Sequence, residues 1–267
     1  MTTTPLEPRS VLLTGAGRGI GRAVALELAE HTRMRLVLVS KSERALDTAA
    51  ACNALRPGSA EGFAWDLVEP GAHSQGAAAL GALAALPGPI ALVHAAAELG
   101  PTGEFASVEL EAWWRAMHTN LFAAVRLVRE LLPRMLAEHA GRVVLFAGGG
   151  AAYGYPGFSS YGTAKAALVR FTETLALELG ERGPIVTILA PGANETELLA
   201  QVRAAGGEVK TTVDIAEPCR AVRRLLTEDT RALNGRFLHV RDEWTADGAR
   251  SFTKELYTLR RVEPPRR

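Results

Sequence analysis

The feature that most constrains the fold of this chain is a regular alternation between short apolar runs and longer segments with helical periodicity. The first apolar run covers 11–14 and ends at a glycine cluster, and a helical pattern begins at Ile20. A second run over 35–39 precedes a helical segment over 43–55, which completes a βαβ unit. Further strands are predicted over 62–65, 90–94, 142–146, 185–189 and 236–240. This pattern is typical of a doubly wound α/β fold with a parallel sheet of about seven strands flanked by helices.

Composition and chain order indicate a single domain spanning 1–267. Hydrophobic residues make up 48% and charged residues 22% of the 267 residues, which are ordinary values for a globular protein. No repeat or long linker interrupts the alternation, so we expect no internal domain boundary. The exceptions are the two ends, 1–8 and 260–267, which we expect to be mobile.

Charge and cysteine content exclude several classes of function. The 30 Lys and Arg residues against 29 Asp and Glu residues leave a net charge of +1, which gives no overall attraction to nucleic acid or to an anionic membrane. Cys52 and Cys219 are too few and too far apart for a disulfide framework or a cysteine zinc site, and we expect both to be buried. We predict no metal site. The polar N-terminal segment has no basic region followed by an apolar stretch, so we expect a cytoplasmic protein.

A glycine-rich turn follows the first predicted strand and opens the first helix. Its sequence is Thr14-Gly15-Ala16-Gly17-Arg18-Gly19-Ile20-Gly21. Glycines at 15, 19 and 21 let the backbone turn sharply and approach a phosphate group, which the helix N-terminus attracts. Ile20 stands where the plain dinucleotide fingerprint has a glycine, so the turn is a variant of the fingerprint of a Rossmann-type domain. The alternative is a flexible glycine turn that binds no ligand.

The end of the second strand favours NADP(H) over NAD(H) as the cofactor. A Rossmann-type site usually has an acidic residue there for the ribose hydroxyl groups, whereas this chain has Ser40-Lys41-Ser42. Lys41 and Arg18 are therefore predicted to face a 2′-phosphate, to which each charge-assisted hydrogen bond contributes on the order of 1.5–3 kcal/mol. In the alternative, Lys41 is a solvated loop residue, Arg18 only begins a helix, and NAD(H) remains possible.

A tyrosine and a lysine four residues apart, Tyr161 and Lys165, open a long helical pattern. This spacing places both side chains on one face of a helix. An ammonium group beside a phenol favours the phenolate, so we predict that Lys165 lowers the pKa of Tyr161 and suits it to proton exchange with a carbonyl or an alcohol. Alone, such a pair is more often a packing residue and a surface charge.

In order and spacing, these motifs resemble those of the short-chain dehydrogenase/reductase family, from about residue 9 to about residue 240. The resemblance implies that Tyr161 protonates the substrate oxygen and that Lys165 holds the nicotinamide ribose and tunes Tyr161. Asn120 falls where the family has a helix asparagine that anchors a water relay. By the same resemblance, the helices that carry Asn120 and Tyr161 pack against a second subunit, which gives a homodimer or homotetramer.

Further positions match the family's cofactor site. Asp66 and Leu67, after the third strand, resemble its adenine-contacting acid and the residue that follows it. Ala95 and Ala96 keep small residues beside the cofactor, and the segment 191–196 is similar to the one that receives the nicotinamide carboxamide. The expected cofactor-binding residues are Gly15, Arg18, Gly19, Ile20, Gly21, Ser40, Lys41, Ser42, Asp66, Leu67, Ala95, Ala96, Tyr161, Lys165, Pro191, Gly192 and Thr196.

One departure from the family pattern affects the expected activity directly. The family's catalytic serine normally lies thirteen residues before the tyrosine, but Gly148 occupies that position within a run of three glycines. Loss of one such hydrogen-bond donor typically costs ~10²–10³ in turnover. The candidate replacements are the backbone amides of 148–150 and the hydroxyl groups of Tyr153, Tyr155 and Ser159. The alternative is that the glycines only make a tight turn and that activity is damaged.

Other departures lie around the pocket. His94 replaces a family asparagine, and we expect a structural histidine that bonds to backbone. The family's C-terminal pattern is also replaced, and we expect Trp244 to close the pocket or a subunit interface. The segment 195–214 is expected to cover the substrate as a moving lid. Its apolar side chains favour a hydrophobic or mixed substrate, and they are Leu198, Leu199, Val202 and Val209.

The sequence therefore predicts an NADP(H)-dependent oxidoreductase. The reaction is hydride transfer between the nicotinamide and a carbonyl or secondary alcohol of a small, partly apolar substrate. Two alternatives remain. In the first, loss of the serine has left a catalytically weak cofactor-binding protein with a regulatory or structural role. In the second, the pocket without the serine catalyses an isomerisation, an elimination or a cyclisation.

Overall fold

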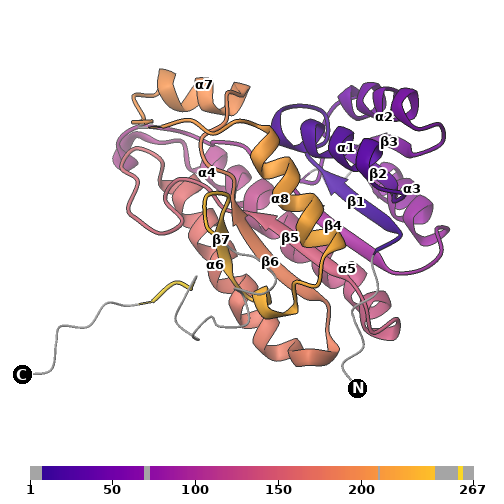
Figure 1. The fold of residues 1–267 in the computed structure, drawn as a ribbon. Coiled ribbons are helices and arrows are strands. Elements are labelled where there is room, and N and C mark those ends of the chain that lie inside the picture. The colour runs from indigo at the N-terminus through magenta and orange to yellow at the C-terminus, as the bar shows by residue number, and fades with distance from the viewer. Residues whose placement is uncertain (1–7, 69–72, 210, 244–257, 261–267) are drawn as a thin grey trace, which may run out of the picture.

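The computed structural model describes residues 8–68, 73–209, 211–243 and 258–260. Within these ranges, seven strands form one parallel sheet in the order β3-β2-β1-β4-β5-β6-β7 (Figure 1). The strands are β1 (Ser10–Thr14), β2 (Arg35–Ser40), β3 (Ala60–Ala64), β4 (Ile90–His94), β5 (Arg142–Phe146), β6 (Ile185–Ala190) and β7 (Phe237–His239). The doubly wound α/β fold is confirmed, with the strand order reversing between β1 and β4.

Helices cover both faces of this sheet (Figure 1). One face carries α1 (Gly19–His31), α2 (Arg44–Leu55) and α8 (Ala216–Thr227). The other face carries α3 (His73–Ala84), α5 (Ala123–Ala137) and α6 (Ser159–Leu179). Two shorter helices are α4 (Leu110–Met117), which runs into the π-helical turn η3 (His118–Phe122), and α7 (Glu197–Ala204). Cys52 and Cys219 are buried and free, as predicted.

Burial explains why most strands can be recognised as continuous apolar runs. Every residue of β1, β4 and β5 is buried, as expected for a parallel sheet covered on both faces. β4 and β5 have the predicted bounds, and β1, β2 and β6 are each one residue longer than predicted. The edge strands differ more, because β3 begins two residues earlier than predicted and β7 is shorter at both ends. An edge strand pairs on one side only, and β3 has no fully buried residue, so the apolar pattern marks its ends poorly.

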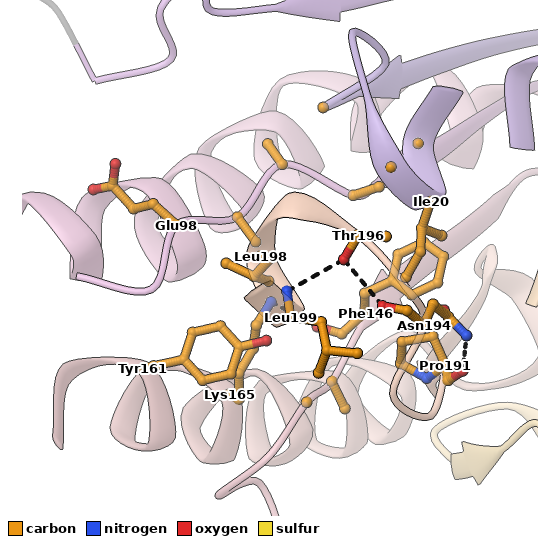
Figure 2. Close-up of a pocket in the computed structure, with 18 of the residues that line it drawn as sticks. Ile20, Glu98, Phe146, Tyr161, Lys165, Pro191, Asn194, Thr196, Leu198 and Leu199 are labelled. Atoms are coloured by element: carbon orange, nitrogen blue, oxygen red, sulfur yellow. Dashed lines mark hydrogen bonds between the residues drawn. The ribbon is translucent and has the colours of Figure 1, made fainter. Parts of the chain in front are cut away.

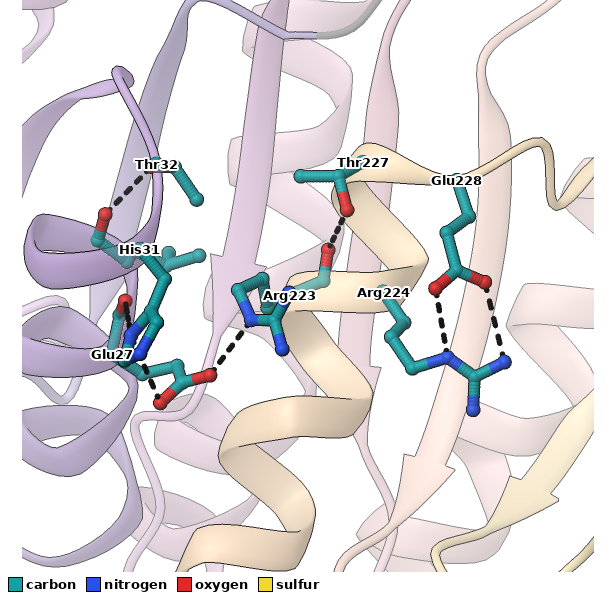
Figure 3. Close-up of polar contacts among 8 residues, drawn as sticks. Glu27, His31, Thr32, Arg223, Arg224, Thr227 and Glu228 are labelled. Carbon is teal, nitrogen blue, oxygen red and sulfur yellow. Dashed lines mark hydrogen bonds and ion pairs between the residues drawn. The ribbon is translucent and has the colours of Figure 1, made fainter.

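Polar contacts fasten α8 to α1 (Figure 3). Arg223 Nε donates to Glu27 Oε1 at 2.8 Å, and His31 Nδ1 lies 3.5 Å from the other oxygen of Glu27. Arg224 pairs with Glu228 at 2.9 Å. Partly exposed ion pairs contribute about 0–1 kcal/mol each, so the buried apolar contacts between these helices dominate. These contacts hold α8, which follows the segment 195–214, against α1, which begins at the glycine turn.

Parts of the predicted ends fall among the described residues. Pro8 is buried. Arg260 Nη2 lies 2.5 Å from Glu173 Oε1, and Arg170 donates to the Leu259 carbonyl at 2.6 Å, so the chain at 259–260 is tied to α6. Trp244, the remainder of the predicted ends and most of the stretch after 243 lie outside the described residues.

Two observations apply only to the part of the chain that the structure describes. None of its helices combines the length and the apolar character needed to cross a membrane. No group of three or more His, Cys, Asp or Glu side chains in that part is arranged to hold a metal ion.

Candidate functional site

A cavity of about 1030 Å³ opens at the carboxyl ends of the strands, where the strand order reverses. Its lining runs from the end of β2, across the glycine turn, to the beginning of α6. Asn120 does not line it. The lining includes every residue predicted to bind the cofactor, namely Gly15, Arg18, Gly19, Ile20, Gly21, Ser40, Lys41, Ser42, Asp66, Leu67, Ala95, Ala96, Tyr161, Lys165, Pro191, Gly192 and Thr196.

The glycine turn leaves the backbone open at the start of α1. Gly15 and Gly19 have φ values of +71° and +53°, in the region that favours glycine. A Cβ on Gly21 would lie 2.2 Å from the Gly15 carbonyl oxygen, and a Cβ on Gly15 would lie 2.5 Å from Ala96 N. Arg18, the N-cap residue of α1, makes no side-chain capping bond, so the first N–H groups of the helix are open to an anion. These observations fit a bound phosphate group.

Two arginines converge on one carboxylate at this end of the cavity. Arg18 pairs with Glu197 Oε2, and Arg44 Nη1 lies 3.2 Å from Glu197 Oε1. Glu197 is the first residue of α7. The sequence predicts that Arg18 and Lys41 face one phosphate together. In the structure Arg18 shares its anion with Arg44 instead, because Arg44 begins α2 directly beside the glycine turn.

Lys41 belongs to a second charged group with Asp66. Lys41 Nζ lies 3.4 Å from Asp66 Oδ2, and Arg115 donates to the same oxygen at 2.8 Å. Burial raises the pKa of Asp66, but hydrogen bonds from the Val68 N–H and Arg115, with the charges of Lys41 and Arg115, outweigh burial and hold the pKa below its ordinary value. Asp66 is therefore ionised at neutral pH, and Lys41 forms an ion pair with it although the lysine side chain is largely exposed.

Tyr161 and Lys165 lie side by side near the start of α6, and both are buried (Figure 2). Lys165 Nζ lies 5.5 Å from the centroid of the Tyr161 ring and donates to the Phe146 carbonyl at 3.0 Å. Burial raises the pKa of Tyr161 to about 12, and the charge of Tyr155 adds to this. The prediction that Lys165 lowers the pKa of Tyr161 is wrong, because the pKa is shifted by burial of the phenol and by the charge of Tyr155, and both raise it. The Tyr161 phenol is thus protonated at neutral pH.

Lys165→Met is expected to stabilise the fold at neutral pH. Burial lowers the pKa of Lys165 from 10.5 to about 8, so between these values the unfolded chain binds a proton that the folded protein has lost. Wild-type stability therefore rises with pH through this window, and the advantage of the variant, on the order of 3 kcal/mol below the window, shrinks. Urea unfolding across this pH range measures the effect. Lys41→Met, at a lysine that is 66% exposed, should follow the wild type. Parallel curves for wild type and Lys165→Met would contradict the prediction.

The glycine run at 148–150 makes room for two tyrosines. A Cβ on Gly148 would lie 2.4 Å from the Tyr161 hydroxyl oxygen, and a Cβ on Gly149 would lie 3.0 Å from Tyr155 Cε1. Gly150 has a φ of +82°, and its Cβ would lie 2.7 Å from a backbone carbon of α6. The interpretation of a simple tight turn therefore fits Gly150, whereas Gly148 and Gly149 provide space for aromatic rings.

Asn120 is buried in the π-helical turn η3. Its Nδ2 donates to the Glu98 carbonyl at 2.7 Å and to the Ala116 carbonyl at 2.8 Å. Its Oδ1 has no hydrogen-bond partner among the described residues. Asn120 thus holds the chain at Glu98, which does line the cavity, and the water relay implied by the family resemblance stays a prediction.

His94 is buried at the end of β4 and does not line the cavity. Its Nδ1 lies 2.9 Å from Thr14 Oγ1, which joins the ends of two neighbouring strands. Burial, with the charge of Lys165, lowers the pKa of His94 to about 3, so the ring is neutral. This setting fits a structural histidine.

The segment 195–214 contains α7, which lies over the tyrosine side of the cavity. The Thr196 hydroxyl accepts from Leu199 N at 3.4 Å and donates to the Asn194 carbonyl at 3.2 Å, which caps the helix (Figure 2). Val202 shares an apolar cluster with Tyr161. The predicted apolar residues of this segment line the cavity, and they are Leu198, Leu199, Val202 and Val209.

Five charged residues that line the cavity were not predicted from the sequence, and they are Arg44, Glu98, Arg115, Glu197 and Glu208. Arg44 follows the loop 40–42 closely, so its position next to Lys41 was an available signal. Arg115 comes from α4 and Glu197 from α7. Nothing in the sequence relates these two residues to Asp66 or Arg18, because the contacts exist only after the helices pack.

Comparison with known proteins agrees with this geometry. The chain is 34% identical over 191 residues to the Ketoacyl reductase HetN of Nostoc sp., a match that covers 71% of this chain and 64% of the Nostoc protein. It is 28% identical over 246 residues to the 3-oxoacyl-acyl-carrier-protein reductase FabG of Escherichia coli, which covers 88% of this chain and 96% of FabG.

The chain is also similar to proteins of known structure. A protein of Beutenbergia cavernae, described as an NAD(P)-dependent gluconate 5-dehydrogenase with bound NADP, superposes with a TM-score of 0.78 at 27% identity, over 89% of this chain and 96% of that protein. Residues 9–206 match the family model for short chain dehydrogenases. Since that match covers most of the sequence, the chain belongs to the short-chain dehydrogenase/reductase family.

Proposed function

We propose that this protein is an NADP(H)-dependent oxidoreductase. It transfers hydride between the nicotinamide and a carbonyl or secondary alcohol of a small, partly apolar substrate. One observation carries the proposal: the cavity that begins at the glycine turn and Arg18 ends at the buried pair Tyr161 and Lys165. The NADP bound to the Beutenbergia protein supports the same class of cofactor here.

The charged end of the cavity supports a phosphorylated ribose. Arg18 and Arg44 share one anion, the Glu197 carboxylate, so both guanidinium groups are within reach of a common anionic group. The end of β2 carries two hydroxyl groups and a cation, in the sequence Ser40-Lys41-Ser42. An acidic residue at this place would repel a phosphate group, and the chain has none there. We therefore expect NADP(H) to bind more tightly than NAD(H).

The opposite end of the cofactor site supports a carboxamide. Asn194 is buried and lines the cavity, and its Oδ1 has no hydrogen-bond partner among the described residues. An amide N–H of a bound ligand would satisfy this acceptor. Asn194 lies between Pro191 and Thr196, in the segment expected from the family resemblance to receive the nicotinamide.

In the proposed reaction, the segment 191–196 would hold a reduced nicotinamide, which would supply the hydride for the substrate carbon. Tyr161 donates its hydroxyl proton to the substrate oxygen, because its raised pKa keeps the phenol protonated. Lys165, whose pKa is lowered by burial to about 8, is largely charged at neutral pH and stabilises the negative charge left on Tyr161. The apolar side chains of α7 and the chain after it exclude water, as a lid over the substrate does.

Removing either arginine is expected to weaken NADPH selectively. Arg18→Ala or Arg44→Ala should raise the Kd for NADPH by roughly 10–100-fold, since each loses a charge-assisted hydrogen bond, while the Kd for NADH changes little. Fluorescence titration of the cofactor-free protein measures both constants. Arg22→Ala is the matched control, because Arg22 is exposed on α1 and does not line the cavity. Equal losses for NADPH and NADH would contradict a role in phosphate binding.

The test of the function itself is NADPH oxidation with a panel of carbonyl compounds. The panel includes 3-oxoacyl thioesters, apolar ketones and keto sugar acids, which represent the chemistries of the relatives. We expect turnover with at least one partly apolar ketone. Tight NADPH binding without any conversion would favour a binding protein instead, and product formation without NADPH consumption would favour an isomerisation, elimination or cyclisation.

We also propose that the chain forms a homodimer or homotetramer. Leu110, Trp114 and Phe122 are large apolar side chains on α4 and η3, and they are 58%, 48% and 45% exposed. A contact between copies of this surface would remove them from water. Sedimentation velocity measures the assembly, and a monomer at assay concentrations would overturn the proposal.

A further inference from the structure

Two tyrosines lie over the same glycine turn. The Tyr161 hydroxyl lies against Gly148, and the Tyr155 ring lies against Gly149. The Tyr155 ring also stacks on Phe158, with ring centroids 4.4 Å apart and planes inclined by 18°. Phe158 and Tyr161 belong to one apolar cluster, and Tyr155 packs against it. Two phenols are thus neighbours at the end of the cavity where the family resemblance places the catalytic tyrosine.

The three hydroxyl groups that were candidates to replace the serine differ in their surroundings. Ser159 accepts a hydrogen bond from Trp113 Nε1 at 3.1 Å and does not line the cavity. Tyr153 is 84% exposed. Tyr155 lines the cavity, is partly buried, and makes no hydrogen bond through its hydroxyl to another described residue. Of the three candidates, Tyr155 alone is both beside Tyr161 and available to a ligand.

The chain after α7 fixes the position of the Tyr155 hydroxyl from the other side. A Cβ on Gly207 would lie 2.9 Å from the Tyr155 hydroxyl oxygen and 2.5 Å from Val202 Cγ1. The ring is therefore held between the glycine turn and the covering segment. Tyr155 packs against the apolar cluster that contains Tyr161, and both residues line the cavity, so the two phenols lie at the same end of it.

We infer that the Tyr155 hydroxyl donates the second hydrogen bond to the substrate oxygen, in place of the serine that the family has at the position of Gly148. This inference rests on the proposed carbonyl reduction. In that step hydride from the reduced nicotinamide adds to the carbonyl carbon, the O–H bond of Tyr161 breaks, and its proton goes to the carbonyl oxygen. Tyr155 keeps its proton throughout and stabilises the negative charge that develops on that oxygen.

Tyr155→Phe tests this role with one atom removed. The ring remains to stack on Phe158, so we expect the fold and the Kd for NADPH to stay unchanged while kcat falls about 10²–10³-fold, as for loss of one donor to a developing oxyanion. Tyr153→Phe makes the same chemical change at the tyrosine of the same loop that also lines the cavity but is 84% exposed and lies outside the apolar cluster of Tyr161, and a larger fall in kcat there than in Tyr155→Phe would assign the donor to Tyr153 and overturn the inference. A purely structural role of Tyr155 would instead alter the melting temperature and NADPH binding.

Gly207→Ala approaches the same hydroxyl group from the other side. Its added methyl group should displace the hydroxyl and lower kcat by roughly tenfold in the wild type, and its effect in the Tyr155→Phe background should be smaller, since only the contacts with Val202 and Phe158 remain. An active wild type with near-normal kcat in Tyr155→Phe would overturn the role of Tyr155 alone. A wild type that binds NADPH but reduces no carbonyl compound would overturn the proposed function and this inference together.

Discussion

Tyr161→Phe should remove nearly all carbonyl reduction and leave NADPH binding intact. The substitution deletes the proton donor, and a positioned acid typically contributes ~10²–10⁴ in rate. The phenyl ring still fills the buried space beside Lys165 and Val202, so the substitution creates no large cavity in the folded protein. Single-turnover reduction at saturating NADPH separates this chemical defect from a defect in binding.

The control for this result is the pair of cofactor titrations. We expect the Kd for NADPH to agree between Tyr161→Phe and wild type, and we expect the two proteins to melt at similar temperatures. Reduction that survives the substitution at more than a tenth of the wild-type rate would mean that another group protonates the substrate oxygen. Tyr155→Phe combined with Tyr161→Phe would then show whether the second phenol is that group.

Gly148→Ser, which introduces the residue that the family resemblance implies at this position, should lower activity rather than raise it. The new Cβ would lie 2.4 Å from the Tyr161 hydroxyl oxygen, closer than atoms can approach without movement. The phenol must therefore shift, and a displacement of about 1 Å in a reacting group can reduce the rate about 10²-fold. Measurement of kcat for reduction of one ketone by the two proteins checks this result.

Gly154→Ser is the matched control for that substitution. Gly154 lies in the same loop, and a Cβ there would meet no atom within 4 Å, so the serine should be tolerated. A Gly148→Ser variant with higher kcat than wild type would show that Tyr161 has room to move without losing its catalytic position. It would also remove the reason for a second donor at Tyr155.

The parts of the fold that the sequence predicts well are those with one dominant physical cause. β4 and β5 are buried on both faces, so their apolar runs mark both ends correctly. α7 is short and carries apolar side chains toward the cavity beside exposed charges, so the sequence suggested only a covering segment without a helix. The π-helical turn at Asn120 could not be predicted from the apolar periodicity, because a single π-helical turn within a helix changes this periodicity very little.

In the candidate site, too, features with a local cause were predicted from the sequence, and features that depend on distant segments were not. Glycine spacing and the Tyr161–Lys165 spacing are local, and the structure brings both motifs to one cavity. The pKa of Tyr161 depends instead on burial by segments far away in the sequence, and here the local expectation had the wrong sign. The partners of Arg18 and Asp66 likewise come from distant helices, so a sequence reading sees the charges but not their pairing.

The ion pair between Glu197 and the two arginines has a consequence for the order of binding. Under the proposed function, a phosphate held by Arg18 and Arg44 would take the place of the Glu197 carboxylate, so cofactor and α7 would compete for one pair of cations. By thermodynamic linkage, each occupant weakens the other by the same factor. The dinucleotide thus frees the first turn of α7 as it enters. Since α7 is then least restrained when the cofactor is already in place, we expect the cofactor to bind before the substrate.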